Sequence, residues 1–308
     1  MKAVRIHRYG GPDELTYEDA PVPEPGAGQL LVRVRAAAIN CVDWKIREGY
    51  LQCCLPHQLP LIPGWDFSGI VEAVGPGTHS MRGEEVYGCP DLSRDGCYAE
   101  FTVVREAATA RKPQSIDHVH AAAIPHAAYT AWHSLFDSAG LVRGQEVFIH
   151  DAAGGIGHMA VQLAKAKGAR VIAATSARNL TFVRELGADQ VVDYRAQRFE
   201  EVVHDVDVVL DTLGGEVQRR SWMVLKPGGV LVSVATPHTQ EMTGRHVAPG
   251  SLTFNQPNTA QLTELAHLTD GGRLRPLVET ILPLADARRA HLLSQGGHTR
   301  GKIVLLIP

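Results

Sequence analysis

The stretch Asp151-Ala152-Ala153-Gly154-Gly155-Ile156-Gly157 decides the fold of this 308-residue chain. The apolar run at residues 147–149 before it is typical of a buried parallel strand. After it, apolar residues recur at helical spacing until Gly168 closes the segment, and a second apolar run follows at residues 171–174. This order predicts one β-α-β unit with the glycine-rich stretch as its first turn.

The small residues of this turn suit a phosphate group. Ala152, Gly154 and Gly157 occupy the three positions of the Gly-x-Gly-x-x-Gly pattern, and Gly155 and Ile156 lie between them. A side chain at the three positions would obstruct a pyrophosphate that approaches the backbone over the helix N-terminus. Glycines at a strand-to-helix turn can also serve the turn alone. The flanking strands favour a dinucleotide-binding site formed by these five residues.

The end of the second strand indicates which dinucleotide binds. An NAD site usually has an Asp or Glu about 20 residues after the glycine turn, where it accepts hydrogen bonds from the ribose. This chain instead has Thr175, Ser176, Arg178 and Asn179, and the next acid, Glu185, belongs to the following helix. An Arg side chain binds phosphate through a planar fork, so the pattern predicts NADP(H). The alternative is that Arg178 is a solvated residue at a helix start.

Composition excludes several classes of protein. The hydrophobic content of 44% in 308 residues is enough for two cores. A net charge of −3 gives no basic field for nucleic acid, and no apolar run resembles a signal peptide or a membrane span. Five cysteines do not form a disulfide framework, so we expect a cytoplasmic protein. At least one of the adjacent Cys53 and Cys54 is expected to be buried.

Two kinds of pattern divide the chain. Up to about residue 120, short strand-like runs at residues 30–34, 67–71 and 101–104 lie between Pro and Gly positions, which predicts a β-rich barrel or sandwich. From there, helices and strands alternate up to residues 230–234, which is typical of an α/β fold with a doubly wound parallel sheet. Residues 302–306 form a last strand, and composition alone does not decide which domain it joins.

Several stretches together resemble one family. The chain is similar to the zinc-free quinone oxidoreductase, or zeta-crystallin-like, branch of the medium-chain dehydrogenase/reductase superfamily. Besides the glycine turn, the matching stretches are Ala38-Ile39-Asn40-Cys41-Val42-Asp43, Pro63-Gly64-Trp65-Asp66-Phe67-Ser68-Gly69, Glu185-Leu186-Gly187-Ala188-Asp189, Asp211-Thr212-Leu213-Gly214-Gly215 and Gly301-Lys302-Ile303-Val304-Leu305. The resemblance implies a GroES-like β-barrel-type domain at residues 1–122, a Rossmann domain at 123–256, and a return to the first domain at 257–308.

The same resemblance bears on metal. Zinc-dependent relatives hold a catalytic zinc with a Cys and a His, and the matching positions here are Asn40 and Trp65, which are not usable ligands. The region of the relatives' structural zinc has only Cys89 and Cys97, and the chain has no Cys-x-x-Cys pair. We therefore expect no zinc. Without a metal to stabilise an alkoxide, alcohol oxidation is not expected, whereas a quinone or enone delocalises the charge left by hydride.

The resemblance also suggests residues around the reacting groups. Asn40 would donate its amide N–H to a substrate oxygen or orient the nicotinamide carboxamide, and Tyr50 would donate a proton or a hydrogen bond. Trp65 would form an apolar wall, with ordinary core packing as the alternative. Asp43 is expected to tie its loop together through backbone N–H groups.

Further cofactor contacts follow from strand ends and from family positions. Because the carboxyl ends of parallel strands face the ligand, the residues at two strand ends should lie along the dinucleotide. They are Asp211, Thr212, Leu213, Val234, Ala235 and Thr236. The resemblance adds Thr130 near the nicotinamide, Tyr194 near the adenosine phosphate, and Phe254 and Lys302 on the nicotinamide side. Thr130 has an alternative as a helix residue bonded to its own backbone.

The predicted function is NADPH-dependent reduction of a quinone or a small α,β-unsaturated carbonyl. One alternative is an enoyl-thioester or enal reductase of a biosynthetic pathway. Another is a non-catalytic NADPH-binding protein of the crystallin or RNA-binding kind. The charge balance lacks the basic patch that RNA favours. The resemblance further suggests a homodimer joined through the edge of the Rossmann sheet.

Overall fold

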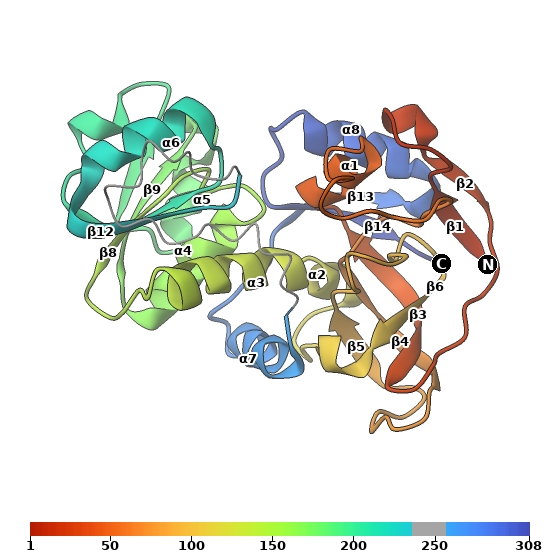
Figure 1. Cartoon of the computed structure of the whole chain (residues 1–308). Helices are drawn as coiled ribbons and strands as arrows, with labels where there is room; N and C mark the ends of the chain where they lie inside the picture. Colours follow the sequence, from red (N-terminus) through yellow and green to blue (C-terminus); the bar gives the residue numbers. More distant parts are fainter. Residues whose placement is uncertain (236–256) are drawn as a thin grey trace. The chain divides into compact units, whose positions relative to one another are not determined.

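A computed structural model describes residues 1–235 and 257–308, which divide into two compact units (Figure 1). Unit 1 comprises Met1–Tyr129, the described part of Gln256–Gly272, and Pro276–Pro308. Unit 2 comprises the described part of Thr130–Asn255 together with Arg273–Arg275. Helix α3 (Pro125–Trp132) contains the point at which the first unit gives way to the second.

Unit 2 is built on a parallel sheet. Its strands and helices are β8 (Glu146–Ile149), α4 (Gly157–Lys167), β9 (Arg170–Thr175), α5 (Leu180–Glu185), β10 (Gln190–Asp193), β11 (Val206–Asp211), α6 (Gly215–Ser221) and β12 (Leu225–Ser233). Within the described residues the strand order is β10-β9-β8-β11-β12, and every neighbouring pair is parallel. The order reverses beside β8, and such a switch point is where open α/β sheets bind ligands.

The predicted β-α-β unit is confirmed by β8, α4 and β9. The first two turns of α4, from Gly157 to Ala164, are buried on all sides, and the helix contacts both β8 and β9. The helix ends at Gly168, whose φ of 84° is left-handed and is adopted readily only by glycine. Unit 2 therefore has an α/β fold whose first crossover starts at the glycine turn.

Unit 1 is built on a mostly antiparallel sheet. Its elements are β1 (Lys2–Arg5), β2 (Thr16–Asp19), β3 (Gln29–Ala38), α1 (Cys41–Arg47), β4 (Phe67–Val74), β5 (Glu85–Gly88), β6 (Phe101–Arg105), β7 (Thr109–Arg111), α2 (His118–Ala122), α7 (Thr259–Asp270), β13 (Val278–Pro283), α8 (Ala287–Gln295) and β14 (Lys302–Leu306). Within the described chain, the main sheet has the order β13-β14-β3-β4-β5-β7, with β6 also paired to β3, while β1 pairs with β2.

The last strand joins distant parts of the chain. Val304 of β14 pairs antiparallel with Ala38 of β3, and the other edge of β14 pairs in parallel with β13. Leu305 belongs to the same buried cluster as Val32 and Phe67. The final strand is therefore an internal strand of the unit 1 sheet.

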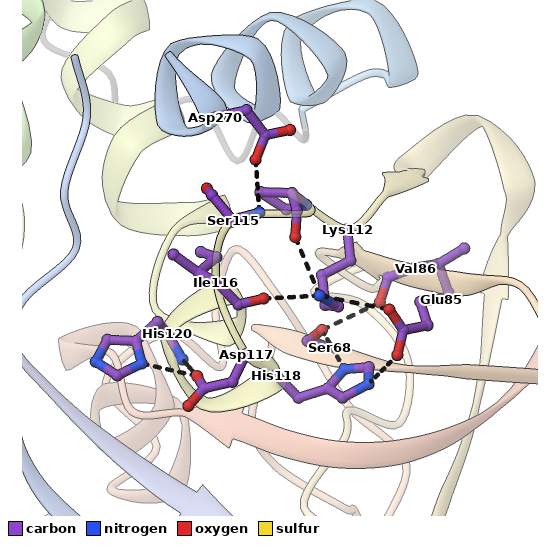
Figure 2. A network of polar contacts seen from close by, with 11 residues as sticks. Ser68, Glu85, Val86, Lys112, Ser115, Ile116, Asp117, His118, His120 and Asp270 are labelled. Carbon is purple, nitrogen blue, oxygen red and sulfur yellow. Dashed lines mark hydrogen bonds and ion pairs between the residues drawn. The ribbon is translucent and has the colours of Figure 1, made fainter. Parts of the chain in front are cut away.

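A polar network fastens α7 and the segment before α2 to the sheet of unit 1 (Figure 2). His118 lies between Ser68 and Glu85, with its Nδ1 2.8 Å from Ser68 Oγ and its Nε2 3.2 Å from Glu85 Oε1. Lys112 Nζ donates to the carbonyl of Ile116 at 2.7 Å. Asp270, at the end of α7, accepts from the backbone N–H of Ser115 at 2.9 Å. These hydrogen bonds hold the segment before α2 and the end of α7 in place within unit 1.

One expectation about the cysteines was wrong. Cys53 and Cys54 are both exposed, because the chain forms surface turns after α1 at this point rather than packing into the core.

Glu185, the nearest acid after β9, is the last residue of α5.

Candidate dinucleotide and active site

The glycine turn folds tightly onto the start of α4. The N–H of Ala152 donates to the carbonyl of Ala174 at 3.0 Å, and that of Gly154 donates to the carbonyl of Asp151 at 2.9 Å. A Cβ built on Gly157 would lie 2.1 Å from the Asp151 carbonyl oxygen, so no larger residue fits there. The turn thus brings its backbone and the N-terminus of an 11-residue helix to the switch point, a geometry that suits a pyrophosphate.

An acidic side chain lies against this turn. Asp151 is exposed and has a left-handed φ of 46°, and a Cβ on Gly154 would lie 2.0 Å from its Oδ2 atom. Its carboxylate therefore covers the face of the glycine that the phosphate pattern leaves open. The pattern identified the turn from its small residues and gave Asp151 no role, although an acid beside a phosphate site weakens anion binding.

The ends of β9 and β10 carry the residues predicted for the 2′-phosphate. Thr175 and Asn179 are buried, Ser176 is half-buried, and Arg178 is exposed. The N–H of Tyr194, which follows β10, donates to the carbonyl of Thr175 at 3.2 Å, and the Tyr194 side chain is 52% exposed. The structure therefore brings Tyr194 beside the end of β9, with no acid between Thr175 and Asn179.

The ends of β11 and β12 are organised by Asp211, the first residue of a stretch that the sequence predicts along the dinucleotide. The buried carboxylate of Asp211 accepts from the N–H groups of Leu213 and Gly214, each at 2.9 Å, and from Ser233 Oγ at 2.7 Å. The N–H of Val234 donates to the Asp211 carbonyl at 2.9 Å.

The predicted residues next to Asp211 take different positions. Leu213 is 52% exposed, whereas Thr212 is half-buried and donates to the carbonyl of His150 at 3.2 Å. The N–H of Ala235 donates to Ser233 Oγ at 3.3 Å. Thr236 and Phe254 lie outside the described residues. Thr130 is half-buried in α3.

Unit 1 brings together Asn40, Asp66 and Lys302. Asn40 Nδ2 donates to Asp66 Oδ2 at 2.9 Å, and Lys302 Nζ donates both to Asn40 Oδ1 and, at 3.3 Å, to Asp66 Oδ2. All three residues are buried, with Asn40 retaining 8% of its surface. Sequence analysis singled out Asn40 and Lys302 separately, and it assigned no role to Asp66.

A second buried acid lies beside this group. Asp43 Oδ2 accepts from the backbone N–H of Asn40 at 2.8 Å and from the Tyr98 hydroxyl at 2.6 Å. The expectation that Asp43 ties its loop through a backbone N–H is confirmed. Burial raises the pKa of Asp43 to about 7, although both hydrogen bonds act in the opposite direction.

The other predicted catalytic residues lie elsewhere in unit 1. Trp65 has no exposed surface, packs with Ile6 and Ile46, and donates its indole N–H to the carbonyl of Asp91 at 3.1 Å. Core packing accounts for this placement, and a wall in contact with substrate finds no support in it. The Tyr50 ring is 66% exposed and lies edge-on to another indole, that of Trp44, at 6.4 Å between centroids.

The donor atoms in unit 1 do not suit zinc. Within the described chain no three His, Cys, Asp or Glu side chains gather in a way that could hold a metal ion. Asn40 offers its amide oxygen to the ammonium of Lys302, and a metal there would face that positive charge. Cys89 and Cys97 are buried and free.

Among the described helices, none is long and apolar enough to cross a membrane.

Two known protein families match this chain, one in each half of the sequence. The family described as "Alcohol dehydrogenase GroES-like domain" matches residues 26–114, and that described as "Zinc-binding dehydrogenase" matches residues 186–305. A quinone-oxidoreductase homolog from spinach (Spinacia oleracea) chloroplasts is 31% identical, over 99% of this chain and 98% of the relative.

Two further relatives extend the match. The chloroplastic NADPH-dependent alkenal/one oxidoreductase of Arabidopsis thaliana is 34% identical over 99% of this chain and 79% of its own length. The solved structure of the quinone oxidoreductase from Coxiella burnetii superposes with a TM-score of 0.91 at 34% identity, and it covers 100% of this chain and 99% of that one. The chain therefore belongs to the quinone-oxidoreductase-like branch of the medium-chain dehydrogenase/reductase superfamily, with a GroES-like domain and a parallel α/β sheet.

Proposed function

We propose that this protein is an NADPH-dependent oxidoreductase that transfers hydride to a quinone or a small α,β-unsaturated carbonyl compound. The observation that carries the proposal is the glycine turn at the switch point of the unit 2 sheet, next to a strand end that offers Arg178 and no acid. Membership of an oxidoreductase family supports the enzymatic activity, and two relatives bear names that refer to quinones or to alkenals and enones.

The cofactor preference rests on charge at the end of β9. The 2′-phosphate of NADP(H) carries negative charge that Arg178 would neutralise, with Ser176 and Tyr194 as further donors. The turn residues 152 and 154–157 would hold the pyrophosphate. Leu213, Val234 and Ala235, at the ends of β11 and β12, would line the rest of the dinucleotide.

The acceptor class follows from the groups that unit 1 offers. NADPH, when bound, supplies the hydride. Asn40 would place an amide N–H against the carbonyl oxygen of the acceptor, where negative charge develops. The ammonium of Lys302 occupies the Asn40 oxygen, so this amide has no oxygen to offer a zinc ion. Alcohol oxidation through a zinc-bound alkoxide is therefore not part of the proposal.

Two properties beyond the reaction belong to the proposal. A cytoplasmic location is supported by the five free cysteines, which fit a reducing compartment. A homodimer is supported by β12, which is an edge strand of the unit 2 sheet within the part of the chain that the structure describes. Sedimentation equilibrium of the full chain tests the second property, and a single species at the monomer mass of 33.3 kDa would contradict it.

Absorbance of NADPH at 340 nm, followed against a panel of quinones, enals, enones and enoyl thioesters, tests the reaction. We expect turnover with at least one quinone or small enone, and a much smaller rate with NADH. Turnover confined to enoyl thioesters would reassign the enzyme to that class. Tight NADPH binding without any turnover would show a non-catalytic NADPH-binding protein.

A further inference from the structure

The side-chain amide of Asn40 is held by two partners of opposite charge. Lys302 can only donate hydrogen bonds, so the Asn40 atom that it contacts is the oxygen. The other atom of the amide, 2.9 Å from Asp66 Oδ2, is therefore the nitrogen, which donates to it. The orientation of this amide is therefore dictated by chemistry, although oxygen and nitrogen positions usually have to be assigned from the surroundings.

Asp66 is itself fixed from two directions. Its Oδ1 accepts from the backbone N–H of His126 at 2.7 Å, in the first turn of α3, while Oδ2 faces Asn40 and Lys302. The Asn40 backbone is held as well, because its N–H donates to Asp43 Oδ2 at 2.8 Å. Hydrogen bonds consequently hold both the backbone and the side-chain carboxamide of Asn40 in place.

One N–H of Asn40 Nδ2 is left over by this arrangement. The nitrogen carries two protons, and among the described residues only Asp66 accepts one of them. The oxygen of the same amide already accepts from a charged donor. Asn40 can thus offer a ligand a donor, whereas an acceptor role would require it to give up Lys302.

We propose that Asp66 and Lys302 are positioning residues that hold the Asn40 carboxamide so that its second N–H donates to the carbonyl oxygen of the acceptor. The inference rests on the proposed function for the identity of the acceptor, but the fixed orientation of the amide does not depend on it. A donor that is already oriented stabilises the oxygen charge that develops when hydride is added, with no reorganisation during the reaction. Asn40 touches the substrate, and the two charged residues act through Asn40.

A double-mutant cycle on kcat separates positioning from general structural support. We expect Lys302→Met to lower kcat at least about tenfold and to leave the dissociation constant of NADPH within about twofold of the wild type. In the Asn40→Ala background the same change should have less than a twofold effect, because the amide that Lys302 positions is absent. Lys165→Met, which removes a lysine paired with Asp189 at 2.8 Å in unit 2, is the matched control and should retain full activity.

Other results of the cycle would overturn the inference. An equal loss of kcat in the wild-type and Asn40→Ala backgrounds would assign Lys302 a structural role alone. A loss confined to NADPH affinity would place the Asn40 donor on the nicotinamide instead. Because Lys302→Met leaves a buried carboxylate without its cation, the neutral pair Asp66→Asn with Lys302→Met provides a second variant that keeps no isolated charge. The cycle is then repeated with that pair.

A direct measurement tests the orientation without turnover. In protein labelled with 15N-asparagine, the side-chain signals of Asn40 are identified by their loss in Asn40→Ala. We expect the Nδ2 proton that is hydrogen-bonded to Asp66 to exchange with water at least about tenfold more slowly than the other Nδ2 proton. Lys302→Met should remove this difference. Equal exchange in the wild type would overturn the positioning role. A fixed amide together with no turnover on any acceptor would instead count against the proposed function.

Discussion

The Tyr98 hydroxyl donates a 2.6 Å hydrogen bond to Asp43 Oδ2, and neither side chain has any exposed surface. The second oxygen of this carboxylate, Oδ1, has no hydrogen-bond partner among the described residues. A buried carboxylate with one bare oxygen is costly to ionise. This explains why burial raises the pKa of Asp43 from 3.8 to about 7.

Asp43→Asn is expected to flatten the pH dependence of stability. An acid with a higher pKa in the folded chain contributes stability that is complete below its unfolded pKa of 3.8 and is lost as the pH rises to about 7. Between these values, the free energy of unfolding of the wild type should fall relative to Asp43→Asn by about 1.4 kcal/mol per pH unit. Urea denaturation of both proteins across this range measures the difference, and parallel curves would contradict the prediction.

Arg178→Ala is expected to weaken NADPH binding and to spare NADH. A charged hydrogen bond to the 2′-phosphate contributes about 1.5–3 kcal/mol, which corresponds to at least about a tenfold rise in the dissociation constant. Fluorescence titration with both nucleotides provides the measurement. Arg170→Ala is the matched control. This exposed arginine starts β9, so it lies at the amino ends of the parallel strands, away from Arg178 at their carboxyl ends. Equal losses for NADPH and NADH would remove Arg178 from the phosphate site.

Asp151→Asn is expected to tighten NADPH binding. Desolvation of its carboxyl group raises the pKa of Asp151 to about 7, so the substitution removes a full negative charge from the glycine turn only above that pH. There the gain should be about threefold to tenfold, from an interaction on the order of 1 kcal/mol that shrinks with added salt. Asn also tolerates the left-handed φ of 46° at this position. Asp205→Asn is the control. Asp205 has a similar φ of 54° but precedes β11, so it lies at the amino ends of the parallel strands, away from the glycine turn. Unchanged affinity would place the phosphates away from Asp151.

Gly157→Ala is expected to damage both the turn and cofactor binding. The added Cβ would overlap the Asp151 carbonyl oxygen and approach the Ala152 Cα atom at 2.8 Å, so the turn would have to shift. We expect a loss of about 1–3 kcal/mol in the free energy of unfolding and a weaker complex with NADPH. Urea denaturation and nucleotide titration measure the two effects. Gly11→Ala serves as the control, since no atom lies within 4 Å of its added Cβ.

Local pattern was sufficient to locate the glycine turn and the strand end that follows it. The turn after β8 and the residues that end β9 are read from consecutive positions, because a change of hydrophobic period marks where strand passes to helix. Arg178 and Thr175 could therefore be singled out from spacing alone, and their contact with the 2′-phosphate stays a prediction. Tyr194 needed the family resemblance, since the hydrogen bond that brings it to Thr175 depends on the pairing of β10 with β9.

The buried group in unit 1 could not be predicted in the same way. Asn40 and Lys302 are separated by 262 positions, and nothing in either neighbourhood indicates that the two side chains meet. Asp66 was overlooked because a single acid next to an aromatic residue has no pattern of its own. For Trp65, composition does not distinguish a buried core ring from a ring that faces a ligand, and the structure shows the ring completely buried.

The central place of β14 in the unit 1 sheet has a consequence for how the chain is made. Residues 302–306 hydrogen-bond to β3 on one side and to β13 on the other, so this sheet can close only after these residues have left the ribosome. Only then does the ammonium of Lys302 reach the carboxylate of Asp66. The sheet of unit 1 therefore closes late in synthesis, whereas the strands of unit 2 from β8 to β12 emerge earlier and can pair before residues 302–306 are made.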